Sequence, residues 1–329
     1  MSGSFYKFYV KTSNYIIKSP ACKAVLNCVY PLVKPLIYKS NTFSISTADF
    51  LFLQHKKGIF IRPDMIVRYM FLEHYYKTPD YCEEAVDMYI KMMDYRNINT
   101  TGEQKVEKFH KLIASCEKNG FNPSFPVEVD KNLLIRDGSH RTSMALFLGT
   151  EEINVHRTNQ NLPVEYKADL FEKTGFTEKE LQLIEAKKAQ LFDRYNTPFA
   201  IVLFDADEAY EDSLANSLAE YGNVVSRDRY SCCAEDFGAV ASKLGKINSK
   251  AGKASTSGGQ HTVSVIMLKL EKPEYAPLDN PKNPVVSQTV KIDKMLKTSS
   301  FGGNCAMAYI SENFGQNIKA VKELSRFFR

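Results

Sequence analysis

Residues 127–157, VEVDKNLLIRDGSHRTSMALFLGTEEINVHR, combine two short strand patterns with a helix between them. The apolar run Leu133–Ile135 predicts the first strand, and Ile153–Val155 predicts the second. A polar turn separates the first strand from the helix, which we expect to end at Gly149. The first amides of a helix have no partner inside it, and the helix dipole favours negative charge there. This stretch therefore predicts an anion site at the start of its helix.

The predicted anion site is a short box of residues at the turn and the first helical turn. Its members are Asp137, Gly138, Ser139, His140, Arg141 and Thr142. Gly138 allows close approach of the backbone to a ligand, and the amides of residues 139–142 are expected to hold phosphate. Arg141 is suited to bidentate contact with phosphate and to neutralising charge during phosphoryl transfer, and His140 to donating a hydrogen bond to phosphate. Asp137 is suited to orienting Mg²⁺ or accepting a proton from an attacking hydroxyl.

A structural interpretation of the same box remains open beside the functional one. Asp137 is also suited to capping the helix, and Arg141 to pairing with a carboxylate such as Glu128. We favour the phosphate site because a glycine turn, a helix start and an arginine converge at one point of the chain.

The box and its surroundings resemble the signature of the ParB/sulfiredoxin-like superfamily. The resemblance covers residues 100–157, where a helix over 101–120 and a strand at Pro126–Val129 precede the box. In that superfamily a Gly-x-His-Arg or related box at a helix N-terminus holds nucleotide phosphates. The free-serine kinases of the superfamily carry a similar Asp-Gly-His box, which implies a similar role for Asp137. The resemblance thus implies an ATP-dependent phosphotransferase that uses Mg²⁺ and acts on a small hydroxyl compound or a surface-glycan precursor.

Other branches of the superfamily fit the sequence less well. Sulfiredoxins carry a cysteine inside the box where this chain has Ser139, so peroxiredoxin repair is not expected. Chromosome-partition members hydrolyse CTP and bind DNA through an adjacent helical domain. The segment after Arg157 is not basic in balance and shows no clear helix-turn-helix, which weakens this branch. A nucleotide-gated DNA-binding regulator is therefore the alternative function and not the favoured one. The layout of the whole chain also resembles uncharacterised ParB-like proteins encoded with surface-polysaccharide enzymes.

The length predicts two domains with extensions, and the strand and helix patterns along the chain predict the α/β (α+β) class. The chain has 329 residues, of which 44% are hydrophobic and 25% charged, and no apolar run approaches the ~20 residues of a membrane-spanning helix. Seven cysteines without CxxC spacing indicate reduced thiols and a cytoplasmic location. We expect five segments: a basic aromatic arm (1–48), a helical segment (49–99), the ParB/sulfiredoxin-like nucleotide-binding domain (100–157), a helical connector (158–198) and a C-terminal α/β domain (199–329) that supplies the acceptor site.

The basic charge of the chain is concentrated in the arm. Residues 1–48 contain six lysines and no acidic residue, whereas the remainder holds 37 basic and 38 acidic residues. Such an arm, rich in aromatic residues, is suited to an anionic membrane surface, which predicts peripheral attachment to the inner membrane face. Packing of the arm on its own domain is an equally weighted interpretation. Nucleic acid is not an expected partner, because the remainder of the chain carries a balanced charge.

A second candidate site follows the apolar strand pattern Phe199–Phe204. Asp205 and Asp207 stand directly after it, and a strand that ends in Asp-x-Asp is suited to holding the divalent cation of a nucleotide sugar. This predicts the weaker alternative function, a metal-dependent glycosyltransferase. We favour the simpler interpretation that Asp207 caps the following helix. The basic, small and polar stretch 246–262 predicts a flexible loop containing His261, and Ser311 is the expected cap of a last helix over 312–328.

Overall fold

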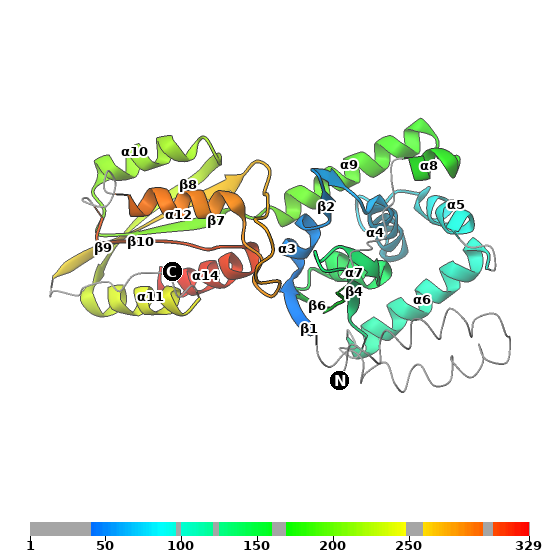
Figure 1. Cartoon of the computed structure of the whole chain (residues 1–329), viewed down its shortest axis with the longest axis horizontal. Coiled ribbons are helices and arrows are strands. Elements are labelled where there is room, and N and C mark those ends of the chain that lie inside the picture. The colour runs from blue at the N-terminus through cyan, green and yellow to red at the C-terminus, as the bar shows by residue number, and fades with distance from the viewer. Residues whose placement is uncertain are drawn as a thin grey trace. The chain divides into compact units, whose positions relative to one another are not determined.

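The computed structural model describes residues 41–96, 100–120, 125–159, 169–247, 259–298 and 305–328 (Figure 1). The described chain divides into two compact units. The first unit contains residues 41–44 and 54–184, and the second contains residues 45–53 and 185–328. Helices and strands occur in both units, which confirms the predicted mixed α/β class. Within the described ranges, no helix combines the length and the apolar character needed to cross a membrane.

The first unit contains a four-stranded sheet in the order β1-β6-β4-β5. Its strands are β1 (Thr42–Ser46), of which residues 42–44 belong to this unit, β4 (Val127–Val129), β5 (Ile135–Asp137) and β6 (Glu152–Arg157). β4 pairs antiparallel with β5 and parallel with β6. Parallel neighbours need a crossover connection, and here the crossover consists of β5 followed by α7 (Ser139–Leu148). A short hairpin of β2 (His55–Lys56) and β3 (Ile59–Phe60) stands apart from this sheet.

The other helices of the first unit begin where the sequence provides start signals. α4 (Pro63–Tyr76) has proline in its first turn, and α6 (Gly102–Asn119) opens with a capping box of Thr101 and Gln104. α9 (Glu178–Tyr195), of which residues 178–184 belong to this unit, opens with a second capping box, which Thr177 and Glu180 form. α5 (Ala85–Arg96) and α8 (Asp169–Lys173) also lie in the described part of this unit. α4 packs on α7, where the Ser143 hydroxyl donates to the Met65 carbonyl at 3.0 Å.

The second unit is an antiparallel sheet with helices on both faces (Figure 1). The strands β7 (Phe199–Phe204), β8 (Gly222–Cys233), β9 (Gln260–Leu270) and β10 (Met307–Ile310) lie in the order β10-β7-β9-β8. α10 (Glu208–Leu218) and α12 (Ser287–Lys297) cover one face, together with α3 (Thr47–Phe52). α11 (Ala234–Ile247) and α14 (Phe314–Phe327) cover the other face. The strand order and alternating directions are those of the split β-α-β arrangement.

Every residue of β7 is buried, because alternate side chains enter two different cores. Phe199, Ile201 and Leu203 pack with α10 and α12, whereas Ala200, Val202 and Phe204 pack with α11 and α14. A strand that is covered on both faces is apolar throughout, and this explains the continuous apolar run in the sequence.

Four boundaries in the structure correct the sequence-based expectations. Residues 42–48 of the predicted arm form β1 and the start of α3, whereas residues 1–40 lie outside the described residues. The segment 49–99 is not helical throughout, because it contains the β2–β3 hairpin. The predicted loop 246–262 ends early, since β9 begins at Gln260 and pairs there with Cys233. The last helix is capped by Asn313, whose side chain accepts from the Gln316 amide at 2.9 Å, and not by Ser311.

Candidate functional site

The predicted box lies at the junction of β5 and α7, and Gly138 forms the turn. Gly138 has φ +102°, a conformation that residues with a side chain rarely adopt. A Cβ atom at this position would stand 3.1 Å from Cγ2 of Val127 and 3.2 Å from its Cα. Glycine therefore serves both the turn and the close approach of α7 to β4.

One of the four backbone amides that we expect to hold phosphate is engaged within α7. The Thr142 amide donates to the Gly138 carbonyl at 2.9 Å, which is the first regular hydrogen bond of the helix. The Thr142 hydroxyl donates to the same carbonyl at 3.1 Å, and the residue is fully buried. Thr142 thus serves the helix, and its amide is no longer a candidate donor to an anion.

Ser139 is fixed by a buried network that sequence reasoning missed. Its hydroxyl accepts a hydrogen bond from Nη2 of Arg62, and Nη1 of Arg62 donates to the Ile135 carbonyl at 3.1 Å. Asp64 accepts from Arg62 at 2.8 and 2.9 Å, and from Arg68 at 2.7 Å. No local pattern near Arg62 points to β5 or α7, since these contacts span more than seventy residues of sequence.

His140 faces the helices of the first unit. Its Nε2 atom lies 2.8 Å from the Tyr89 hydroxyl of α5, and its ring meets the Phe109 ring of α6 edge-on at 4.6 Å. Edge-to-face contacts of this kind stabilise aromatic packing. The side chain that was predicted to contact phosphate is thus part of the α5–α6–α7 contact.

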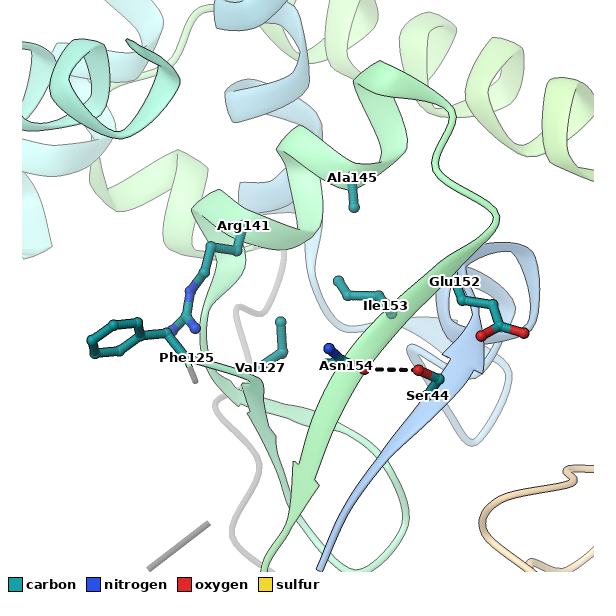
Figure 2. Close-up of a pocket in the computed structure, with 8 residues that line it drawn as sticks. All are labelled: Ser44, Phe125, Val127, Arg141, Ala145, Glu152, Ile153 and Asn154. Carbon is teal, nitrogen blue, oxygen red and sulfur yellow. Dashed lines mark hydrogen bonds between the residues drawn. The ribbon is translucent and has the colours of Figure 1, made fainter. Parts of the chain in front are cut away.

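Arg141 is the member of the box that enters a pocket (Figure 2). The pocket has a volume of about 160 Å³ and lies between α7 and the strands β4, β6 and β1. Its lining consists of Ser44, Phe125, Val127, Arg141, Ala145, Glu152, Ile153 and Asn154. The Arg141 side chain is 18% exposed, and its Nη1 atom donates to the Pro126 carbonyl at 2.9 Å. This bond holds the guanidinium in one orientation at the pocket wall.

Asp137 stands beside Arg141 at the end of β5. One carboxylate oxygen of Asp137 lies 4.0 Å from Nη2 of Arg141, and the Asp137 side chain is 66% exposed. The N-cap residue of α7 is Gly138, without a side-chain cap, so Asp137 does not cap this helix. The ion partner of Arg141 is Asp137 rather than Glu128. An exposed carboxylate next to an arginine is suited to a Mg²⁺ ion that also contacts substrate phosphate, because Mg²⁺ needs only one or two protein carboxylates.

The remaining polar groups of the pocket are mixed in character. The Ser44 hydroxyl donates to Oδ1 of Asn154 at 2.7 Å, which joins β1 to β6 at the pocket floor (Figure 2). Glu152 is exposed at the start of β6. The pocket therefore combines one cation, one amide and one carboxylate over an apolar base of Val127, Ala145 and Ile153.

Asp205 and Asp207 are both engaged in hydrogen bonds within the second unit. Asp207 caps α10 by accepting from the Tyr210 amide at 2.6 Å, which confirms the favoured interpretation. Asp205 accepts from the Thr262 amide at 2.9 Å and lies 2.8 Å from Nδ1 of His261. A cation at these two residues would have to displace these bonds. Among the described residues, no cluster of three or more His, Cys, Asp or Glu side chains is arranged for metal binding.

The fold and the site together define an α/β protein of two units, with a candidate anion pocket in the first. Comparison with protein-family models, curated protein sequences and solved structures found no match to this chain.

Proposed function

We propose that the first unit binds the phosphate groups of a nucleotide between the first turn of α7 and the Arg141 pocket. The observation that carries this proposal is the orientation of Arg141. Its guanidinium is fixed by the Pro126 carbonyl, is largely buried and forms part of the pocket wall. A fixed planar guanidinium in the first turn of a helix suits the geometry of phosphate oxygens.

The size of the pocket limits which part of a ligand it holds. Pockets that enclose a whole drug-sized ligand measure roughly 300–1,000 Å³, whereas this one measures about 160 Å³. The pocket therefore holds a fragment such as a phosphate group, and the rest of the nucleotide lies outside it. Phe125, at 39% exposure, offers an aromatic surface at this position.

The reaction that we propose is ATP-dependent phosphoryl transfer to a small hydroxyl compound or a surface-glycan precursor. Arg141 neutralises charge on the transferred phosphoryl group, and Asp137 accepts the proton of the attacking hydroxyl. In the alternative role of Asp137, its carboxylate would hold the Mg²⁺ that is bound with the nucleotide, and Mg²⁺ would shield phosphate charge. The separation of 4.0 Å between Asp137 and Arg141 supports a shared role at one reacting centre.

Calorimetric titration in the presence of Mg²⁺ tests this function with ATP, ADP, CTP and UDP-sugars as ligands. We expect the full chain to bind adenine nucleotides, and Arg141→Ala to bind them about 10–100-fold more weakly. Arg136→Ala is the matched control, because Arg136 lies on β5 in the same unit but does not line the pocket. A preference for CTP would favour the DNA-binding alternative. Binding of UDP-sugars that survives Arg141→Ala but is lost in Asp205→Ala would favour the glycosyltransferase, and absence of all binding would contradict the proposal.

A further inference from the structure

An amide side chain of β6 lines the same pocket as Arg141. Asn154 is the third residue of β6, and the Ser44 hydroxyl of β1 donates to its Oδ1 atom at 2.7 Å. Both residues belong to the lining of the pocket of about 160 Å³ that contains Arg141 (Figure 2). The pocket therefore has a polar side chain from the sheet in addition to the guanidinium from α7.

The hydrogen bond from Ser44 fixes the orientation of the Asn154 amide. A carboxamide carries its acceptor oxygen and its donor nitrogen on two branches of one plane, so the branch that accepts from Ser44 leaves the nitrogen directed elsewhere. In Figure 2 the oxygen faces Ser44, whereas the nitrogen points toward Val127 and the side of the pocket where Arg141 lies. The N–H groups of Asn154 are therefore turned toward the pocket.

Arg141 and Asn154 both keep N–H donors that the described protein does not use. Nη1 of Arg141 donates to the Pro126 carbonyl, but the Asp137 oxygen near Nη2 is 4.0 Å away, which exceeds hydrogen-bond distance. Within the described ranges, the Asn154 side chain makes one hydrogen bond, in which it accepts from Ser44. A ligand that enters this pocket is therefore expected to bring acceptor atoms for two residues.

A phosphate group matches this arrangement of donors. Its terminal oxygens point in different directions from one phosphorus atom, so one oxygen can face Arg141 while another faces Asn154. The carboxylate of Glu152 also borders the pocket, but Figure 2 shows it at the opposite end from Arg141. The negative charge of Glu152 is thus kept away from the guanidinium that would receive the phosphate.

We propose that Nδ2 of Asn154 donates to the phosphate group that Arg141 binds, and that Ser44 is a positioning residue for Asn154. This inference rests on the proposed function, because it assigns a second binding residue to the same phosphate site. Arg141 supplies positive charge from α7, and Asn154 supplies a neutral donor from β6. The site then recognises a phosphate through oxygens that face two different walls of the pocket.

Calorimetric titration with two ligands, each in the presence of Mg²⁺, tests the role of Asn154. ATP is one ligand, and tripolyphosphate, which carries the phosphates without a nucleoside, is the other. Asn154→Asp keeps the shape of the side chain and an oxygen that accepts from Ser44, but it replaces the donor nitrogen by a charged acceptor. We expect Asn154→Asp to bind both ligands at least about tenfold more weakly.

Asn132→Asp is the matched control for the added charge. Asn132 is exposed in the turn between β4 and β5 and does not line the pocket. This variant is expected to bind both ligands as the parent chain does. Thermal unfolding shows whether each variant is folded. If Asn154→Asp does not fold, Asn154→Ala takes its place, with an expected loss of about 2–12-fold for one neutral hydrogen bond.

A double-mutant cycle tests the positioning role of Ser44. Ser44→Ala is expected to weaken ATP binding by about two- to fivefold, because the Asn154 amide loses its fixed orientation. Once Asn154→Ala has removed that amide, adding Ser44→Ala should cause no further loss. Equal losses from Ser44→Ala in the parent chain and in Asn154→Ala would overturn the positioning role.

Arg141→Ala, titrated in parallel, separates this inference from the proposed function. If Arg141→Ala weakens ATP binding and folded Asn154→Asp does not, the phosphate site stands and the role of Asn154 is overturned. If Asn154→Asp weakens binding of ATP but not of tripolyphosphate, Asn154 contacts the nucleoside, which also overturns the inference. A parent chain that binds neither ligand would contradict both proposals.

Discussion

Arg62 joins the start of α4 to the start of α7 by donating a hydrogen bond to the Ser139 hydroxyl. The Arg62 side chain is 1% exposed, so its charge requires a partner, and Asp64 provides it at 2.8 Å. A third contact, to the Ile135 carbonyl, ties the same guanidinium to β5. The buried ion pair of Arg62 and Asp64 therefore stabilises the turn between β5 and α7, which precedes Arg141.

Removal of Arg62 is expected to destabilise the first unit strongly. Arg62→Ala should lower the free energy of unfolding by about 3–5 kcal/mol, because it breaks a buried charge network. Ser139→Ala should cost only about 1–3 kcal/mol, the penalty for one lost partner of a buried donor. Urea unfolding measures both values, with Arg136→Ala as a control on β5. Equal effects of Arg62→Ala and Arg136→Ala would contradict this role of the network.

Gly138→Ala tests the close approach of α7 to β4. We expect a loss of about 2–4 kcal/mol, since the variant suffers both backbone strain and a clash with Val127. Gly58→Ala is the matched control, because Gly58 also has positive φ (+76°) but has no atom within 4 Å of the added Cβ. That variant should lose only about 1 kcal/mol. Thermal unfolding measures the loss of stability in both variants. Equal losses of stability would contradict a clash with Val127, because backbone strain is common to both positions.

His140 provides a test of which side chains contact phosphate. Its ring lies against Tyr89 and Phe109, so His140→Ala should destabilise the first unit by about 2 kcal/mol or more. Nucleotide affinity should change by less than about threefold, because the pocket does not include this side chain. Calorimetry on the folded variant measures the affinity. A loss comparable to that of Arg141→Ala would show that His140 does contact the ligand.

Asp49 makes the stability of the second unit depend on pH. Burial raises the pKa of Asp49 from 3.8 to about 6, although the Tyr275 hydroxyl and the Phe314 and Gly315 amides stabilise the carboxylate. The folded state therefore holds a proton between pH 4 and 6 that the unfolded state releases. Stability is expected to fall as pH rises through this window, by on the order of 3 kcal/mol, and to level off above it.

Asp49→Asn is the variant that isolates this group. Urea unfolding between pH 4 and 7.5 should show a flatter dependence on pH in Asp49→Asn than in the parent chain. Parallel curves for the two proteins would show that Asp49 does not titrate in this window.

The sequence predicted the local features of the fold, because these depend on neighbouring residues. The end of α7 at Gly149 follows from a glycine that directly succeeds the last helical residue. The continuous apolar run Phe199–Phe204 likewise predicted the buried strand β7.

The parts of the site that the sequence did not predict depend on contacts between distant residues. Arg62 and Ser139 are 77 residues apart, Asp205 and His261 are 56 apart, and Ser44 and Asn154 are 110 apart. Periodicity and turn signals report which face of an element is buried, but not which element covers it. For this reason His140 was assigned to phosphate, whereas in the fold its ring completes a helix contact.

The affinity for ATP with Mg²⁺, measured by calorimetry for the parent chain, Arg141→Ala and Arg136→Ala, tests the central claim most directly. We expect Arg141→Ala to bind about 10–100-fold more weakly, the effect of losing charged hydrogen bonds to phosphate worth about 1.5–3 kcal/mol. Arg136→Ala should bind as the parent chain does. Equal affinities of the two variants for ATP would contradict a phosphate site at Arg141.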